Sequence, residues 1–105
     1  MDYQDAITAL ADPTRRSIIE RLRAGALPVS AIAKGMPVSR PAVSQHLRVL
    51  SDAGLLQVTP VGKRRLYAIA PEGVAGLRQY LDSLWDDALA AFARAAEEKA
   101  KGKQQ

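Results

Sequence analysis

Residues 39–54 read S-R-P-A-V-S-Q-H-L-R-V-L-S-D-A-G, and this stretch predicts a short helix with a marked beginning and end. Ser39 is a good N-cap, because its hydroxyl can accept a hydrogen bond from a free backbone N–H of the first turn. Pro41 falls in that first turn, where a missing N–H costs nothing. Gly54 follows the last helical residue, where a left-handed C-cap favours a residue without a Cβ.

The side chains of this helix divide into a buried stripe and a polar face. Val43, Leu47 and Leu50 recur at helical spacing and predict the stripe. The polar face has no acidic residue among its members, which are Arg40, Ser44, Gln45 and Arg48. Hydroxyl, amide and guanidinium groups of this kind contact base edges and phosphates in a DNA major groove. An ordinary amphipathic surface helix is the alternative that this stretch alone leaves open.

The length and composition fit one small domain. A chain of 105 residues lies near the lower end of the size at which a single core is self-sufficient. Its 48% hydrophobic content is rich in alanine and includes only one Trp, three Tyr and one Phe, so the core should be aliphatic and modest. Small domains often gain the missing burial by oligomerising, so a dimer is expected.

What the sequence lacks excludes several classes of protein. There is no cysteine, which excludes disulfides and thiolate metal sites and is compatible with a reducing cytoplasm. The sequence has no run of eighteen apolar residues, so no transmembrane helix is expected. The first residues, M-D-Y-Q-D-A, lack the basic and apolar regions of a signal peptide. We therefore expect a cytoplasmic protein without membrane contact.

The net charge of +4 is unevenly distributed along the chain. Residues 13–70 contain ten Lys and Arg residues against two acidic residues, a net charge of +8. The remaining residues contain five basic and nine acidic side chains, a net charge of −4. A basic centre with acidic flanks favours a polyanionic partner for the centre over a general gain in solubility.

Before residue 39 the pattern predicts three short helices, over residues 2–11, 14–24 and 30–34. The first carries apolar side chains at helical spacing, namely Tyr3, Ala6, Ile7 and Leu10. The second follows a capping Asp12 and Pro13, and its inward residues are Ile18, Ile19 and Leu22. Residues 27–29 are expected to form an extended link. The third helix and the one at residues 39–54, joined by a tight turn, fit a helix-turn-helix.

After Gly54 the sequence predicts strand, turn, strand. Leu55, Leu56 and Val58 precede the turn, and the second strand contains Leu66, Tyr67 and Ile69. The tip between them reads Gly62, Lys63, Arg64, Arg65. Burial of apolar side chains cannot explain this tip, because it contains none. Next to a helix-turn-helix we favour a wing that grips phosphates, over a solvated turn that happens to be basic.

A long helix is expected from Pro71 onward. Its apolar stripe continues over five turns through Val74, Leu77, Leu81, Leu84, Trp85, Ala88 and Phe92. This stripe is longer than one small domain can cover, so we expect a partner helix from a second copy of the chain. Beyond Arg94 the sequence becomes polar. We therefore expect a domain over residues 1–96 and a fraying polar tail over residues 97–105.

Three stretches of the sequence together resemble the ArsR/SmtB family of bacterial repressors. They are D-P-T-R-R-S-I-I-E-R-L at residues 12–22, P-V-S-R-P-A-V-S-Q-H-L-R-V-L-S-D-A-G-L-L at residues 37–56 and G-K-R-R-L-Y-A-I-A-P-E-G at residues 62–73. The resemblance covers residues 3–92. It implies a mainly α winged helix-turn-helix, with about five helices and a two-stranded wing, that forms a homodimer through its first and last helices.

The resemblance also implies which residues act. The DNA-facing residues would be Ser39, Arg40, Pro41, Ser44, Gln45, His46 and Arg48 on the recognition helix, with Lys63, Arg64 and Arg65 on the wing. The dimer interface would comprise Tyr3, Ile7 and Leu10 from the first helix and Leu77, Leu81, Leu84, Trp85 and Ala88 from the last.

The sequence departs from the metal sensors of that family. Where those sensors carry a cysteine pair, this chain reads Leu27, Pro28, Val29, Ser30, Ala31. The last helix has acidic residues but no histidine. We therefore expect no metal site and no cofactor, and the nearest likeness is to cysteine-free members, whose inducers are mostly unidentified. An unidentified small-molecule effector is compatible with this likeness.

A few residues allow two interpretations. His46, the only histidine, is either partly buried packing or a DNA-side donor. Asp82, Asp86 and Asp87 favour a solvated acidic face over a cation site across a dimer seam. Arg15 and Arg16 could touch phosphate or simply solubilise their helix. Tyr80 and Trp85 favour core or dimer packing over an effector pocket between protomers.

These observations predict a dimeric, metal-independent repressor that binds an inverted repeat in double-stranded DNA. The alternative is a winged-helix module that binds other proteins and no longer binds DNA. The net charge of +8 in the central residues favours the repressor. An enzyme is not expected, because no nucleophile, oxyanion donor or phosphate loop lies near the paired carboxylates.

Overall fold

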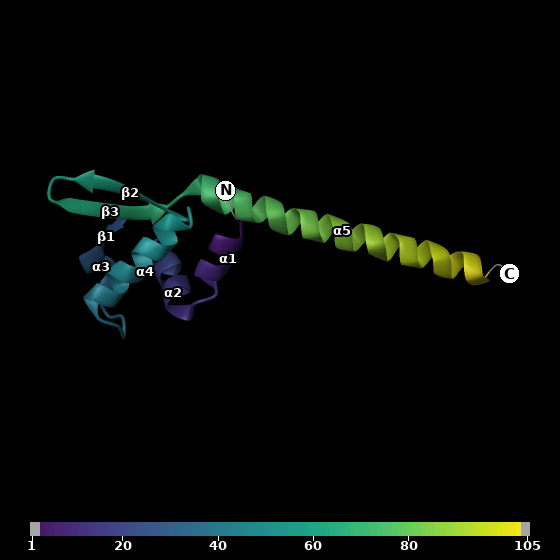
Figure 1. The fold of residues 1–105 in the computed structure, drawn as a ribbon, viewed down its shortest axis with the longest axis horizontal. Coiled ribbons are helices and arrows are strands. Elements are labelled where there is room, and N and C mark those ends of the chain that lie inside the picture. The colour runs from purple at the N-terminus through teal and green to yellow at the C-terminus, as the bar shows by residue number, and fades with distance from the viewer. Residues whose placement is uncertain (1–2, 104–105) are drawn as a thin grey trace.

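The computed structural model describes residues 3–103. Its elements in chain order are α1 (Tyr3–Leu10), α2 (Pro13–Arg21), β1 (Leu27–Pro28), α3 (Val29–Ala33), α4 (Arg40–Asp52), β2 (Leu56–Val61), β3 (Arg64–Ile69) and α5 (Pro71–Lys103). Figure 1 shows the first seven elements gathered into one body, from which α5 projects. The molecule is therefore elongated, with principal extents of 74 × 26 × 22 Å.

The core lies between the helices of the body and the inner end of the hairpin. Its largest fully buried side chains are Ile18, Ile32, Val43, Leu47, Leu50 and Leu55. The predicted stripe of α4 is thus confirmed, and each such side chain stabilises the fold by about 1.5–3 kcal/mol relative to exposure. Ile19, expected to face inward, is only partly buried at the margin of this core.

Local capping fixes the two ends of α4. The hydroxyl of Ser39 accepts a hydrogen bond from the Ala42 N–H at 3.3 Å. At the other end Gly54 has φ +80°, and the N–H groups of Gly54 and Leu55 donate to the carbonyls of Ser51 and Leu50. This paired pattern needs a left-handed residue, which explains why the chain has glycine there.

The ends of two shorter helices differ from the expectation. α2 ends at Arg21 rather than at residue 24, because the Leu22 N–H bonds to the carbonyls of both Ile18 and Ile19 and tightens the last turn. α3 begins at Val29 rather than at residue 30. Both differences move a boundary without changing which helices form.

The sheet has three antiparallel strands in the order β1-β3-β2. The predicted hairpin is confirmed, with Val61 opposite Arg64 and a loop in which Gly62 has φ +61°. The expected extended link at residues 27–29 is confirmed for Leu27 and Pro28 and wrong for Val29, which begins α3; Leu27 also pairs with Tyr67 and adds a third strand to the predicted pair. Pro28 is tolerated there because β1 is an edge strand and one side of it needs no N–H donor.

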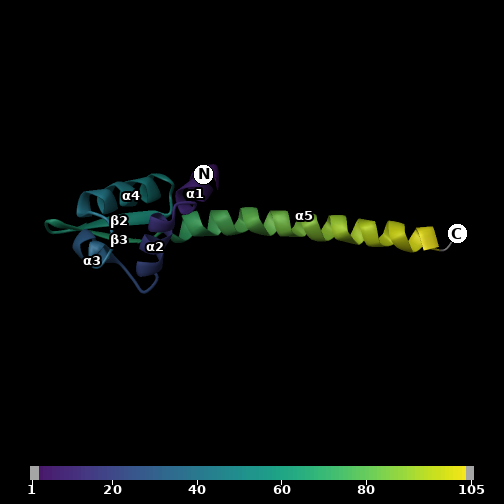
Figure 2. The same ribbon diagram turned by 90° about the horizontal axis from the view of Figure 1, so that it is seen from below.

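α5 is a single helix of 33 residues, about 50 Å long. It runs through Lys103, so the fraying expected from residue 97 onward is not seen in the described residues, and the division at residue 96 stays a prediction. Gln105 and the rest of the expected tail beyond Lys103 lie outside the described residues. Figure 2 shows the helix extending away from the body, at the opposite end from the hairpin tip.

Candidate nucleic-acid interface

The outward face of α4 is positioned by its buried stripe. With Val43, Leu47 and Leu50 in the core, the residues on the other side of the helix are exposed, namely Ser39, Arg40, Pro41, Ser44, Gln45 and Arg48. In the described part of the chain, the Arg40, Gln45 and Arg48 side chains have no hydrogen-bond or ion-pair partner. Their donors are therefore available to a ligand outside the protein.

The wing lies beside this face and adds positive charge. A hollow of about 270 Å³ separates the wing from the start of α4, and it is lined by Pro28, Val29, Ser30, Arg40, Lys63, Arg64, Arg65 and Tyr67. A second hollow of about 480 Å³ lies between α4 and the sheet, lined by Ser44, Arg48, Ser51, Val58, Arg65 and Tyr67. Neither lining contains an acidic residue. The fold thus brings the predicted cations of helix and wing to one surface that is complementary to phosphate.

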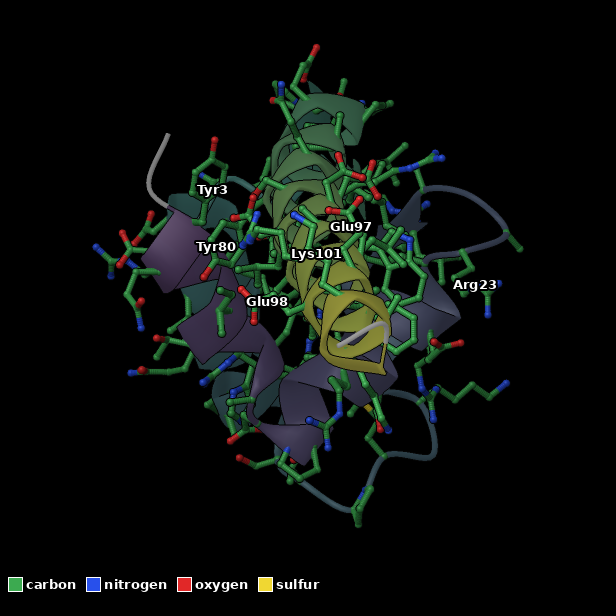
Figure 3. The ribbon with its side chains drawn as sticks, turned by 90° about the vertical axis from the view of Figure 1, so that its right-hand side faces the viewer. Tyr3, Arg23, Tyr80, Glu97, Glu98 and Lys101 are labelled. Atoms are coloured by element: carbon green, nitrogen blue, oxygen red, sulfur yellow. The ribbon has the colours of Figure 1, made fainter. Side chains whose placement is uncertain are left out.

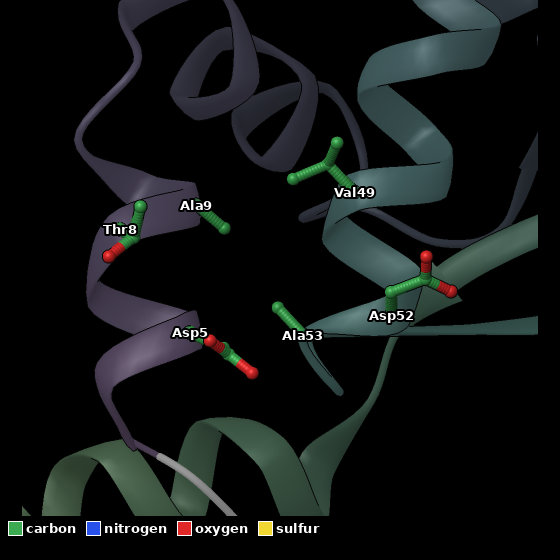
Figure 4. Close-up of a pocket in the computed structure, with 6 residues that line it drawn as sticks. All are labelled: Asp5, Thr8, Ala9, Val49, Asp52 and Ala53. Atoms are coloured by element: carbon green, nitrogen blue, oxygen red, sulfur yellow. The ribbon is translucent and has the colours of Figure 1, made fainter.

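A third hollow, between α1 and α4, has the opposite character. It measures about 240 Å³ and is lined by Asp5, Thr8, Ala9, Val49, Asp52 and Ala53 (Figure 4). The carboxylates of Asp5 and Asp52 make it unsuitable for phosphate, so it is not part of the basic surface.

His46 lies apart from the exposed donors of α4. It is partly buried, and its Nδ1 lies 3.4 Å from Nη1 of Arg15 on α2. Because an arginine can only donate, Nδ1 has the acceptor role in a hydrogen bond between these two atoms. Partial burial agrees with the packing alternative, while a direct DNA contact stays a prediction.

Arg15 and Arg16 have a role that the sequence analysis missed. The Arg15 Nε donates to the Ala9 carbonyl at 2.6 Å, and Arg16 Nη1 donates to the Leu10 carbonyl at 3.0 Å. Both guanidinium groups thus satisfy free carbonyls at the C-terminal end of α1, where positive charge is favoured. Neither of the two roles proposed from the sequence, phosphate contact or solubilisation, describes these bonds. Arginines placed just after a short helix were the available signal.

Asp12 completes this junction as the N-cap of α2. Its carboxylate accepts hydrogen bonds from the backbone N–H groups of Thr14 at 2.8 Å and Arg15 at 3.1 Å. The Arg15 N–H bond is the main reason that the pKa of Asp12 lies below its ordinary value. The Thr14 bond and the charges of Arg15 and His46 act in the same direction, while desolvation opposes them.

Comparison with known proteins decides the family. A model of the helix-turn-helix domain matches residues 10–59. The HTH-type transcriptional regulator Rv2034 of Mycobacterium tuberculosis is 54% identical over 86 residues, which cover 82% of this chain and 80% of that protein. An ArsR-like transcriptional regulator from Rhodococcus sp. RHA1 matches with a TM-score of 0.75 and 30% identity over 90% of this chain and 92% of that one. The chain belongs to the ArsR family.

Another solved structure bears on assembly. The homodimeric winged helix-turn-helix DNA-binding domain of Mb0332 from Mycobacterium bovis, described as a possible ArsR-family regulator, matches with a TM-score of 0.64. Its identity is 31%, and the match covers 80% of this chain and 78% of that one. As an ArsR-family member, the present chain is a DNA-binding transcriptional regulator and not an enzyme, as its sequence predicts.

This ArsR-family chain leaves much apolar surface exposed on α1 and α5. Of the predicted dimer residues, Leu10 and Leu77 are partly buried, and those exposed to solvent are Tyr3, Ile7, Leu81, Leu84, Trp85 and Ala88. Leu89 and Phe92 continue the stripe, and Phe92 is 73% exposed. Exposed apolar residues in this number are compatible with an interface, and the predicted dimer interface stays a prediction.

Two further predictions concern ions and membranes. Among residues 3–103 no three His, Asp or Glu side chains come together as a metal site. Asp82 forms an exposed ion pair of 3.9 Å with Arg78, while the predicted solvated role of Asp86 and Asp87 stays untested. Within the same residues no helix has the length and apolar character to cross a membrane.

The aromatic residues of α5 differ in their surroundings. Tyr80 stacks on Tyr3 within the chain, whereas Trp85 is 64% exposed. An effector pocket beside Trp85 in this ArsR-family regulator stays a prediction.

Proposed function

We propose that this regulator is a repressor that binds an inverted-repeat operator as a homodimer. The observation that carries the proposal is the acid-free surface on which the free donors of α4 adjoin the cations of the wing. In this arrangement α4 enters the major groove, Gln45 and Ser44 contact base edges, and Arg40 and Arg48 contact phosphates. On the wing, Lys63, Arg64 and Arg65 contact phosphates of the flanking DNA backbone, and these contacts add affinity without sequence preference.

The dimer follows from the exposed apolar surface of α1 and α5. Two recognition helices must lie about 34–36 Å apart to enter successive major grooves on one face of DNA. Only a fixed pair of protomers sets that distance, and one half-site contact is too weak to compete with bulk DNA. Occupation of an operator of this length by the dimer excludes RNA polymerase from an overlapping promoter, which is why we propose repression. A regulator of this kind acts in the cytoplasm, where the chromosome of a bacterium lies.

The test is a selection of genomic DNA fragments on the purified protein, followed by footprinting of the enriched sequence. The expected footprint is two-fold symmetric, with two chains bound per operator and at least about 10³-fold preference over random DNA. A reporter driven by the footprinted promoter should rise when the regulator is deleted. Absence of any enriched sequence, together with weak retention on heparin, would instead favour a protein-interaction module.

A further inference from the structure

Arg15 joins three helices that meet on one side of the body. It belongs to the first turn of α2, which packs against both α1 and α4 (Figure 1). Its Nε and Nη2 donate to the carbonyls of Ala9 and Thr8 on α1, at 2.6 and 3.4 Å. Its Nη1 contacts Nδ1 of His46 on α4 at 3.4 Å. One planar group therefore connects the last turn of α1 to the middle of α4.

The fully buried side chains of α1 are small, while Leu10 packs at the margin of the core and Tyr3 stacks on Tyr80 of α5. The two buried side chains of α1 are Ala6 and Ala9, each with a single methyl group. Small side chains allow helices to approach closely, but they offer few atoms that resist rotation or sliding. A guanidinium group is rigid and planar, with donors in a fixed fork. Arg15 therefore supplies an angular restraint between α1 and α4 that the alanines cannot.

We propose that Arg15 is a positioning residue that holds the recognition helix α4 at a fixed angle to the dimerisation helix α1. This inference rests on the proposed function, in which α1 contacts the partner and α4 reads DNA. Since both protomers contain the junction, any change in its angle moves both recognition helices. Arg15 thus sets their separation without touching DNA, and His46 is the α4 group through which it acts.

Arg16 provides a matched control for this role. Its Nη1 donates to the carbonyls of Leu10 and Ala11, at 3.0 and 3.3 Å, and so it satisfies the same end of α1. It has no bond to α4. Arg15→Ala and Arg16→Ala each remove one arginine that caps α1, but only Arg15→Ala removes the connection between α1 and α4.

The first experiment measures the separation of the recognition helices in the absence of DNA. Because the chain has no cysteine, Gln45→Cys allows one spin label per protomer, and pulsed dipolar spectroscopy then reports the distance across the dimer. We expect one narrow distance distribution in this parent and in Arg16→Ala, and a distribution at least about twice as wide in Arg15→Ala. Equal widths in all three proteins would overturn the role of Arg15 alone. The absence of any dipolar distance in the parent would overturn the proposed dimer and this role with it.

The second experiment uses the selected operator and a variant with one base pair inserted between its half-sites. The insertion displaces one half-site by about 3.4 Å along the DNA. The wild type should bind the inserted operator at least tenfold more weakly, and Arg15→Ala should reduce this discrimination to less than threefold. His46→Leu should reduce the discrimination between the two operators to less than threefold, whereas His46→Gln, which keeps an acceptor, should keep a discrimination of at least tenfold whatever its absolute affinity.

Two results of the second experiment would contradict the proposal. Unchanged spacing discrimination in both Arg15→Ala and His46→Leu would show that the junction has no influence on the recognition helices. A flatter salt dependence of binding in Arg15→Ala with the spacing discrimination unchanged would show that Arg15 contacts phosphate instead. Thermal melts of the variants accompany both measurements, and His46→Leu provides the test if Arg15→Ala does not fold.

Discussion

Tyr3 stacks on Tyr80, with ring centroids 5.2 Å apart and an angle of 16° between the ring planes. This contact fastens the start of α1 to α5, and Figure 3 shows the two rings together on one side of the long helix. Stacked aromatic pairs of this geometry stabilise a fold by about 0.5–1.5 kcal/mol beyond their burial. The contact therefore links α1, which carries the exposed Ile7, to the helix that carries the apolar stripe.

Loss of the α5 stripe should abolish both dimerisation and DNA binding. We expect Leu81→Glu with Leu84→Glu to give a folded monomer that no longer binds the operator, although no DNA-facing residue has changed. The control is Gln79→Glu with Ala90→Glu. It also introduces two glutamates into α5, but at positions that helical spacing places away from the apolar stripe. Sedimentation and a gel-shift titration on the same sample provide the measurement. Wild-type affinity in a folded monomer would contradict this prediction.

The wing should contribute affinity that depends on salt but not on sequence. Replacement of Lys63, Arg64 and Arg65 with alanine removes six cations from a dimer, which should flatten the log–log salt dependence by up to about five units. Binding to operator and to random DNA should weaken by similar factors. Alanine at Arg94, Lys99 and Lys101 makes the same change in net charge on distal α5 and should leave the slope unaltered. An unchanged slope in the wing variant would show that the wing does not contact DNA phosphates.

Gln45 should read a base. A glutamine amide can pair with N6 and N7 of adenine, and such a contact discriminates by about 1–3 kcal/mol. Gln45→Ala should therefore relax the preference at one position in each half-site, measured by binding to a library of operator variants. Gln79→Ala on α5 is the control for loss of an exposed amide. An equal loss of affinity for operator and random DNA would instead identify Gln45 as a backbone contact.

Gly73 should be intolerant of a side chain. It lies in the first turn of α5, so close to Gly54 that a Cβ at Gly73 would overlap the Gly54 carbonyl group. Gly73→Ala should destabilise the fold by about 1–3 kcal/mol, because backbone atoms must move. Gly102→Ala, with open space around its Cβ position, should leave the melting temperature unchanged or slightly higher. Equal melting temperatures for the two variants by circular dichroism would show that the contact is not close in solution.

Asp12 should make stability depend on pH in the acid range. Since hydrogen bonding to the Arg15 N–H lowers the pKa of folded Asp12 below the unfolded value, its contribution is present above about pH 4 and is lost as pH falls through the lowered pKa. The stability difference between wild type and Asp12→Ala should therefore be largest at neutral pH and shrink below pH 4. Urea unfolding at several pH values measures this difference, and growth of the difference on acidification would contradict the assignment.

The recognition helix and the hairpin could be predicted from the sequence because their signals are local. Ser39 and Gly54 act on backbone groups a few residues away, and the stripe of α4 repeats with the period of the helix. In the hairpin, Gly62 supplies the positive φ that the turn requires. The DNA-facing face of α4 then follows, since a helix that buries one stripe must expose the opposite side.

Only the tertiary structure decided which distant groups meet. The strand that Leu27 forms depends on Tyr67, and the bond of Arg15 to His46 spans 31 positions. No periodicity in a short segment records such partners, because each side chain gains its acceptor only when separate helices and strands pack. The same reason explains why the sequence did not show that Arg15 and Arg16, two adjacent cations in a basic segment, donate to α1 carbonyls.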